Sequence, residues 1–175
     1  MIELAWLADA AKELIRVGLK AYQVSDSRRE LRTCVRAQIK RELVFNREVL
    51  NELLRTNGTD EPTWQGDERE RLIRALRTAG FDALDAHLIP LDVFFDDKLI
   101  EEQHSKVFCP DREKPPAHYS RVQDLNSQVD LLERTYRRLH FAKLYEESGS
   151  RKPNFEYLRY LVVSSILSLD GPGAP

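Results

Sequence analysis

The chain has 175 residues and a formal net charge of −2, with 27 Lys and Arg against 29 Asp and Glu. This length suits one domain, and we interpret residues 1–175 as a single helical domain. A dedicated nucleic-acid binder usually shows a basic excess, so the overall charge argues against that role. The composition, 42% hydrophobic and 32% charged, is typical of a globular protein with a charged surface.

The start of the chain and its two cysteines bear on the compartment. Residues 1–6 lack the basic start and apolar run of a signal peptide, and no stretch reaches the roughly 18 apolar residues of a membrane span. Cys34 falls on a predicted apolar helix face, and Cys109 precedes Pro110 in a predicted loop. We interpret both as reduced, structural cysteines, and we expect a soluble, cytoplasmic protein.

Residues 2–22 are predicted to form an amphipathic helix. Its apolar positions follow three- and four-residue steps at Leu4, Leu7, Ala11 and Leu14. Gly18 lies on the same face and would let a neighbouring helix approach closely, which makes it a candidate interaction position. Trp6 and the amphipathic pattern could suit a membrane surface, but the charges cancel, so we expect burial rather than membrane contact.

The second predicted helix covers 27–56 and would be about 45 Å long. Ser27 and Glu30 form a capping box at its start. Its apolar seam has the spacing of a coiled coil and contains Ile39, Leu43, Asn46, Leu50 and Leu53. Asn46 is the polar exception on this seam. Because a buried amide needs hydrogen-bond partners, we interpret it as a residue that fixes register or oligomeric state.

A basic stripe also runs along this helix, with one cation every four residues: Arg28, Arg32, Arg36 and Lys40. Repulsion within such a row is mildly unfavourable, so the stripe often faces negative groups. We consider it a candidate anion-binding surface, for phosphate or for the acidic run over 92–102 in this chain or a partner. No aromatic residue interleaves the stripe to stack bases, and a solvated or ion-paired face is the favoured interpretation.

The middle of the chain is predicted to be short helices and loops. Residues 57–66 are predicted as a loop, followed by a short helix that starts at Asp67 and ends at Gly80, then a turn or two over 81–88. Pro90 suits the first turn of a further helix. That helix would carry Val93, Phe94, Leu99 and Ile100. Residues 108–118 contain three prolines and are predicted as a loop.

Two more helices complete the prediction. The first covers 120–145 with a capping box of Ser120 and Gln123, and the second follows Pro153 and ends before a flexible tail at 171–175. No alternating β-branched segment competes with these helices. We therefore predict an all-α protein, an elongated antiparallel bundle of five to six helices with two long central helices.

A metal site is the first catalytic candidate. Glu101 and His104 have the Glu-x-x-His spacing that helical di-iron bundles use. Such a site needs this pair twice, and the sequence contains it once. We therefore interpret the region as an acidic helix face and expect neither a metal nor another cofactor.

The second catalytic candidate is Arg134 and His140, with Thr135 directly after the arginine. An Arg, four to six residues and a His resembles the signature of HEPN domains, a family of helical-bundle ribonucleases. The resemblance implies metal-independent RNA cleavage near a dimer interface. Imidazole can move a proton from the 2′-hydroxyl while guanidinium holds the phosphate.

Chance also accounts for this motif. With 19 Arg and 4 His in the chain, about one match is expected by chance, and Arg112 to His118 is a second match. On a regular helix the side chains of Arg134 and His140 would point about 120° apart. The favoured function is therefore a non-enzymatic protein that mediates protein–protein interaction or scaffolding and self-associates. The HEPN-like ribonuclease is the alternative.

Overall fold

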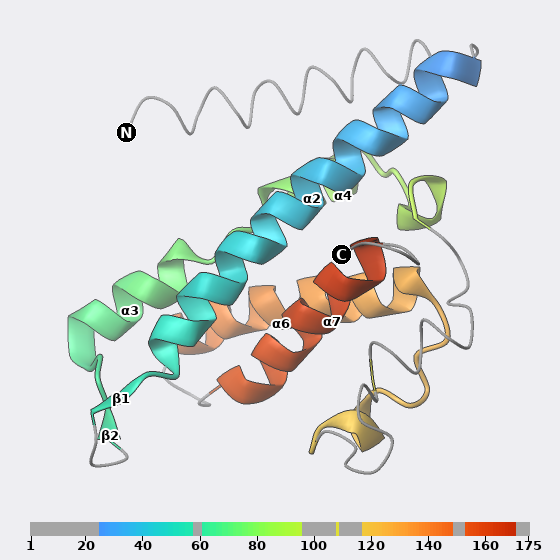
Figure 1. The fold of residues 1–175 in the computed structure, drawn as a ribbon. Coiled ribbons are helices and arrows are strands. Elements are labelled where there is room, and N and C mark those ends of the chain that lie inside the picture. The colour runs from blue at the N-terminus through green and yellow to red at the C-terminus, as the bar shows by residue number, and fades with distance from the viewer. Residues whose placement is uncertain (1–24, 58–60, 96–107, 109–116, 149–152, 171–175) are drawn as a thin grey trace.

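The computed structural model describes five stretches of the chain: residues 25–57, 61–95, 108, 117–148 and 153–170. Helices dominate these stretches, which confirms the all-α class (Figure 1). The predicted helix over 2–22, with Gly18, lies outside the described residues. Of the helices that are described, none is long and apolar enough to cross a membrane.

Helix α2 (Ser25–Leu53) has 29 residues and is about 44 Å long. It covers most of the helix predicted over 27–56, and all five of its seam residues, including Asn46, are buried. The predicted bounds were wrong, because Ser27 lies inside the helix rather than at its cap and Thr56 lies beyond its end. Cys34 was predicted on an apolar face and is instead exposed. The prediction was wrong because, in this part of α2, the neighbouring Val35 is the residue that is buried in the core.

A short hairpin begins at Thr56, at the end of the helix predicted over 27–56, and continues into the predicted loop over 57–66. Strands β1 (Thr56–Asn57) and β2 (Glu61–Pro62) pair antiparallel, with Thr56 opposite Pro62. The Thr63 N–H then donates to the Arg55 carbonyl at 2.9 Å. Two-residue strands are too short for an alternating pattern, so the sequence contained no signal for them.

The predicted helix from Asp67 to Gly80 is two helices in the structure. Helix α3 (Gly66–Ala75) ends before a three-residue break, and α4 (Ala79–Ala86) begins after it. Gly80 therefore lies in the first turn of α4 rather than at a helix end. A Cβ at Gly80 would lie 3.2 Å from Glu42 Oε2 and 3.3 Å from an Ile39 side-chain carbon, so the glycine permits close approach of α4 to α2.

In the described residues 91–95, directly after Pro90, the chain forms a single 3₁₀ turn, η1 (Leu91–Val93). Leu99 and Ile100, predicted on a helix here, lie outside the described residues. Phe94 and Phe95 follow η1 and are buried in the core. The apolar residues after Pro90 therefore reach the core from the end of this turn.

Helix α6 (Gln128–Ser148) begins eight residues later than predicted. The Asp130 N–H donates to Ser127 Oγ at 2.9 Å, so Ser127 caps the helix instead of Ser120. Ser120 lies in a 3₁₀ turn, η2 (Tyr119–Arg121). Val122 and Leu125 are buried from this non-helical segment, which explains why the apolar spacing resembled a longer helix.

Helix α7 (Phe155–Asp170) lies against both α2 and α6 (Figure 1). Its start is capped by Asn154, whose Oδ1 accepts the Tyr157 N–H at 2.8 Å. Buried Ser165 lies 2.9 Å from Thr135 Oγ1 of α6, hydroxyl to hydroxyl. The long helices α2 and α6 are thus joined through α7, so the fold is centred on this shorter helix.

Candidate functional site

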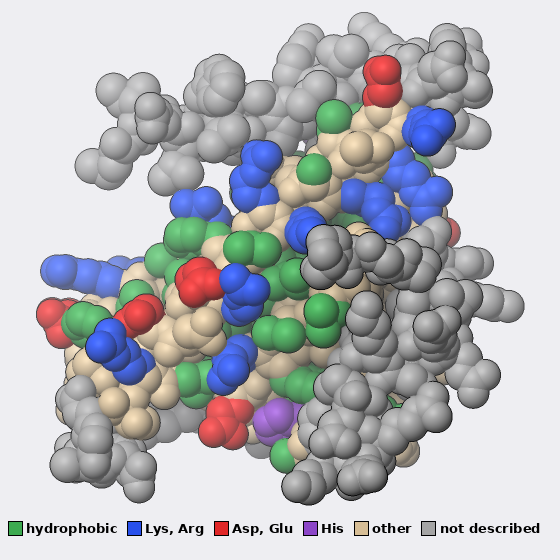
Figure 2. Space-filling model, in the orientation of Figure 1, with side chains coloured by type: hydrophobic (Ala, Val, Ile, Leu, Met, Phe, Trp, Pro, Cys, Tyr) green, Lys and Arg blue, Asp and Glu red, His purple; other side chains and the backbone are tan. Residues whose placement is uncertain are grey.

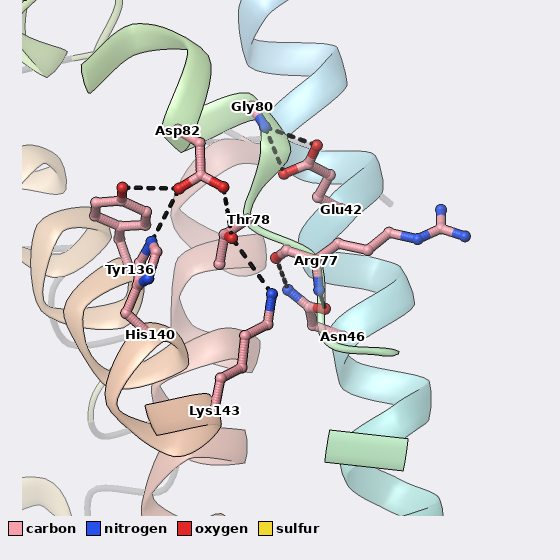
Figure 3. A network of polar contacts seen from close by, with 9 residues as sticks. All are labelled: Glu42, Asn46, Arg77, Thr78, Gly80, Asp82, Tyr136, His140 and Lys143. Carbon is pink, nitrogen blue, oxygen red and sulfur yellow. Dashed lines mark hydrogen bonds and ion pairs between the residues drawn. The ribbon is translucent and has the colours of Figure 1, made fainter. Parts of the chain in front are cut away.

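A network of polar side chains lies where α2, α4 and α6 meet (Figure 3). In its α2 part, the amide of Asn46 pairs with one backbone residue: Nδ2 donates to the Arg77 carbonyl at 2.8 Å, and Oδ1 accepts the Arg77 N–H at 2.7 Å. Asn46 is fully buried. Both halves of its amide are therefore satisfied inside the chain, where they fix the break between α3 and α4 on α2.

Glu42, one turn before Asn46, caps the start of α4. Its carboxylate accepts the Gly80 N–H at 2.8 and 3.0 Å, and the Gln38 amide donates to it at 3.2 Å. A negative group at a helix N-terminus is favourable, but Glu42 is only 3% exposed. Burial raises the pKa of Glu42 above its usual value, and the hydrogen bond from Gly80 partly opposes this rise.

Asp82 of α4 joins the α6 part of the cluster. Its Oδ1 lies 2.9 Å from both Tyr136 Oη and His140 Nε2, and its Oδ2 accepts the Thr78 hydroxyl at 2.8 Å. Lys143 Nζ lies 3.5 Å from the same hydroxyl. Burial raises the pKa of Tyr136, and the bond to Asp82 adds to the rise, so its hydroxyl stays a proton donor. The arrangement orients His140, whose side chain is 40% exposed.

The structure gives Arg134 and His140 separate partners. Arg134 Nη1 donates to the Arg121 carbonyl at 2.7 Å, on the side of η2. His140 faces Asp82 on α4. The two residues that the HEPN resemblance implies for RNA cleavage therefore bind different partners, Arg134 at η2 and His140 at α4.

The basic stripe of α2 faces other parts of the same chain. Figure 2 shows Lys and Arg side chains gathered on the N-terminal half of α2. Arg32 Nε donates to the Phe94 carbonyl at 2.9 Å, and Arg36 Nη1 donates to Gln128 Oε1 at 3.3 Å. Lys40 forms an ion pair with Asp170 at the end of α7. These bonds connect α2 to η1, α6 and α7; the side chain of Arg28 lies outside the described residues.

The solvent side of α6 combines charge with exposed apolar groups, and we name it the α6 outer face. From its start to its end it contains Asp130, Glu133, Arg134, Arg137, Arg138, Phe141 and Leu144. Phe141 is 44% and Leu144 52% exposed. All but Leu144, together with Leu125, line a surface hollow of about 600 Å³. Such a surface can receive a partner that offers both charge and apolar groups.

A second, smaller hollow lies beside this face, and we name it the α4 hollow. It has a volume of about 280 Å³. Its apolar lining comes from α4 and the segment after it: Phe81, Leu84, Ile89, Pro90 and Leu91. Asp85, Glu133, Tyr136 and Arg137 complete the lining, so the hollow combines an apolar part with charged and polar side chains.

Sequence reasoning missed Glu42 and Asp82, which hold the cluster together. Glu42 lies three residues after Ile39 and four before Asn46, beside the predicted seam, and this position was the available signal. Asp82 had no comparable signal, because its partners come from α6. Among the described residues no group of three metal-ligating side chains occurs, and Glu101 and His104 lie outside them.

Comparison with protein-family models, curated proteins and solved structures finds no match for this chain.

Proposed function

We propose that this chain is a non-enzymatic helical protein of the cytoplasm that self-associates through the α6 outer face. The observation that supports this is the exposure of Phe141 and Leu144, one turn apart, beside three arginines. Exposed apolar side chains bordered by charges are typical of protein-binding surfaces. The exposed free thiol of Cys34 suits a reducing compartment.

The order of charges on α6 favours a second copy as the partner. Asp130 and Glu133 come first, and Arg134 and Arg137 follow. If two α6 helices cross antiparallel near Glu133 and Arg134, the acidic positions of each helix lie opposite the basic positions of the other. Such a contact is isologous, the usual arrangement in homodimers.

The ion pair between Glu133 and Arg137 on this face can be exchanged for pairs with another copy at low cost. Within one chain Arg137 pairs with Glu133 at 2.8 Å, but the arginine side chain is 70% exposed. Exposed helical ion pairs contribute only about 0.3–0.5 kcal/mol. Replacing this intrahelical pair with pairs between copies therefore loses little.

The test is a charge exchange followed by light scattering. Arg134→Glu with Arg137→Glu should be monomeric, as should Asp130→Lys with Glu133→Lys, while a mixture of the two should form heterodimers. Arg41→Glu, at an exposed position of α2, is the matched control and should remain dimeric. A monomer mass for the unmodified protein at tens of micromolar would contradict the proposal.

A ribonuclease that uses Arg134 and His140 is the second candidate. The observation in its favour is the bond between His140 Nε2 and Asp82, because a carboxylate that orients an imidazole prepares it for proton transfer. We expect no cleavage of labelled single-stranded RNA in EDTA, since Arg134 lies against η2. Cleavage that is lost in His140→Ala would favour the enzyme instead.

A further inference from the structure

The end of α4 places a leucine where glycine is favoured. The Ile89 N–H donates to the Leu84 carbonyl at 3.0 Å, and the Leu88 N–H donates to the Asp85 carbonyl at 2.9 Å. These two bonds form a Schellman motif, in which the first residue past the helix cap takes the left-handed conformation. Leu88 has φ +54°, the only positive φ of a non-glycine among the described residues. A Cβ is unfavourable there.

Leu88 is also exposed to solvent to an unusual degree. Its side chain is 89% exposed, more than Phe141, Leu144 or Leu167. The chain therefore carries a strained backbone and a solvated leucine at one position, where Gly or Asn would avoid both costs. Backbone strain at a residue with few contacts in its own fold suggests that its side chain contacts another molecule.

The α4 hollow begins at the next residue. Ile89, Pro90 and Leu91 belong to its apolar lining, and its volume is about 280 Å³. An apolar cavity of roughly 150 Å³ already accepts a benzene-sized group, so the hollow has room for a leucine side chain. One surface thus presents an exposed apolar side chain and, beside it, a recess that is apolar in part.

We infer that Leu88 of each copy inserts into the α4 hollow of the other copy. Two-fold symmetry makes both contacts at once, because the side chain and the recess belong to the same surface. The hollow borders α6 at Glu133 and Arg137, where the two α6 helices are proposed to cross. The inference rests on the proposed self-association and specifies its apolar contact.

Hydrogen-bonding groups support this placement. The exposed His87 precedes Leu88, and the border of the hollow carries Asp85 and Glu133. Insertion of Leu88 would bring the imidazole of one copy beside the carboxylates of the other. The imidazole N–H of His87 can then donate to one of these carboxylates.

Leu88→Gly and Leu88→Asn test the inference, because both tolerate the left-handed conformation and remove the apolar side chain. We expect a melting temperature higher by about 2–4 °C at a protein concentration where wild type and variants are monomeric. In contrast, the dimer Kd from sedimentation equilibrium should rise at least tenfold. Leu167→Asn, at an exposed leucine of α7, is the control and should leave Kd unchanged.

The outcomes distinguish the role of Leu88 from the proposed self-association through the α6 outer face. An unchanged Kd in both Leu88 variants, with the α6 charge exchange still effective, would overturn the role of Leu88 alone. A monomeric unmodified protein would overturn both. The expected result is a rise in Kd together with a rise in melting temperature. If Leu88 served the stability of the monomer, its replacement would lower the melting temperature instead.

Discussion

The polar cluster drawn in Figure 3 has two parts that differ in burial. One part consists of Glu42 and Asn46 on α2, and the other of Asp82 on α4 with its contact to His140 on α6. The α2 pair is almost fully buried and bonds to backbone N–H and carbonyl groups. The Asp82 and His140 side chains are 46% and 40% exposed. Burial, not the number of hydrogen bonds, should therefore decide which contacts the fold depends on, since water replaces lost partners at the surface.

Asn46→Leu should give the largest effect. It leaves both the N–H and the carbonyl of Arg77 without their partner in a buried position. We expect the free energy of unfolding to fall by about 2–4 kcal/mol in urea denaturation. An increase in stability would instead mean that Asn46 sets register between copies at a cost to the monomer.

Glu42→Gln should act through pH. Because the pKa of Glu42 is raised in the folded protein, its contribution to stability is full below pH 4.5 and is lost as pH rises through the folded pKa. The unfolding free energy of Glu42→Gln relative to wild type should therefore increase between pH 4 and pH 7. Glu30→Gln, which changes an exposed carboxylate at the start of α2, is the matched control.

Tyr136→Phe tests the exposed half of the cluster. It removes one of the three donors to Asp82 and keeps the ring that stacks on Phe81 at 5.0 Å. We expect a loss of about 0.5–1.5 kcal/mol in urea denaturation, smaller than for Asn46→Leu. A loss equal to that of Asn46→Leu would show that exposure does not distinguish the two halves.

Lys40→Ala should give the smallest effect. The Lys40 side chain is 41% exposed, although its ion pair with Asp170 connects α2 to the end of α7. We expect the free energy of unfolding to change by less than about 1 kcal/mol, and less at high salt. A larger loss that persists in 1 M salt would contradict this estimate.

The helical fold could be predicted because it depends on local spacing. The seam of α2 and the apolar positions Leu158, Leu161, Val162 and Ile166 of α7 are buried as their periodicity indicates. The start of α6 could not be predicted from this spacing. Val122 and Leu125 continue the helical pattern of apolar residues, but they are buried by tertiary contacts outside the helix. The structure uses Ser127 as the cap in place of the predicted Ser120.

The polar cluster could be predicted only in part. Asn46 was recognisable from its seam position, but its partner Arg77 lies 31 residues later, in a break that the sequence did not indicate. The stripe of Arg32, Arg36 and Lys40 was recognisable as a row of charge. Its partners include a backbone carbonyl and an amide as well as a carboxylate, and composition does not reveal the first two.

The central place of α7 has a consequence for synthesis on the ribosome. Helix α2 emerges early, but the helix that covers much of its apolar face follows about a hundred residues later; Lys40 and Asp170 are 130 residues apart. At about 5–20 residues per second, the seam of α2 is without this cover for roughly 5–20 seconds. During that interval the seam is a target for chaperones and for aggregation, and folding is completed only after α7 has left the exit tunnel.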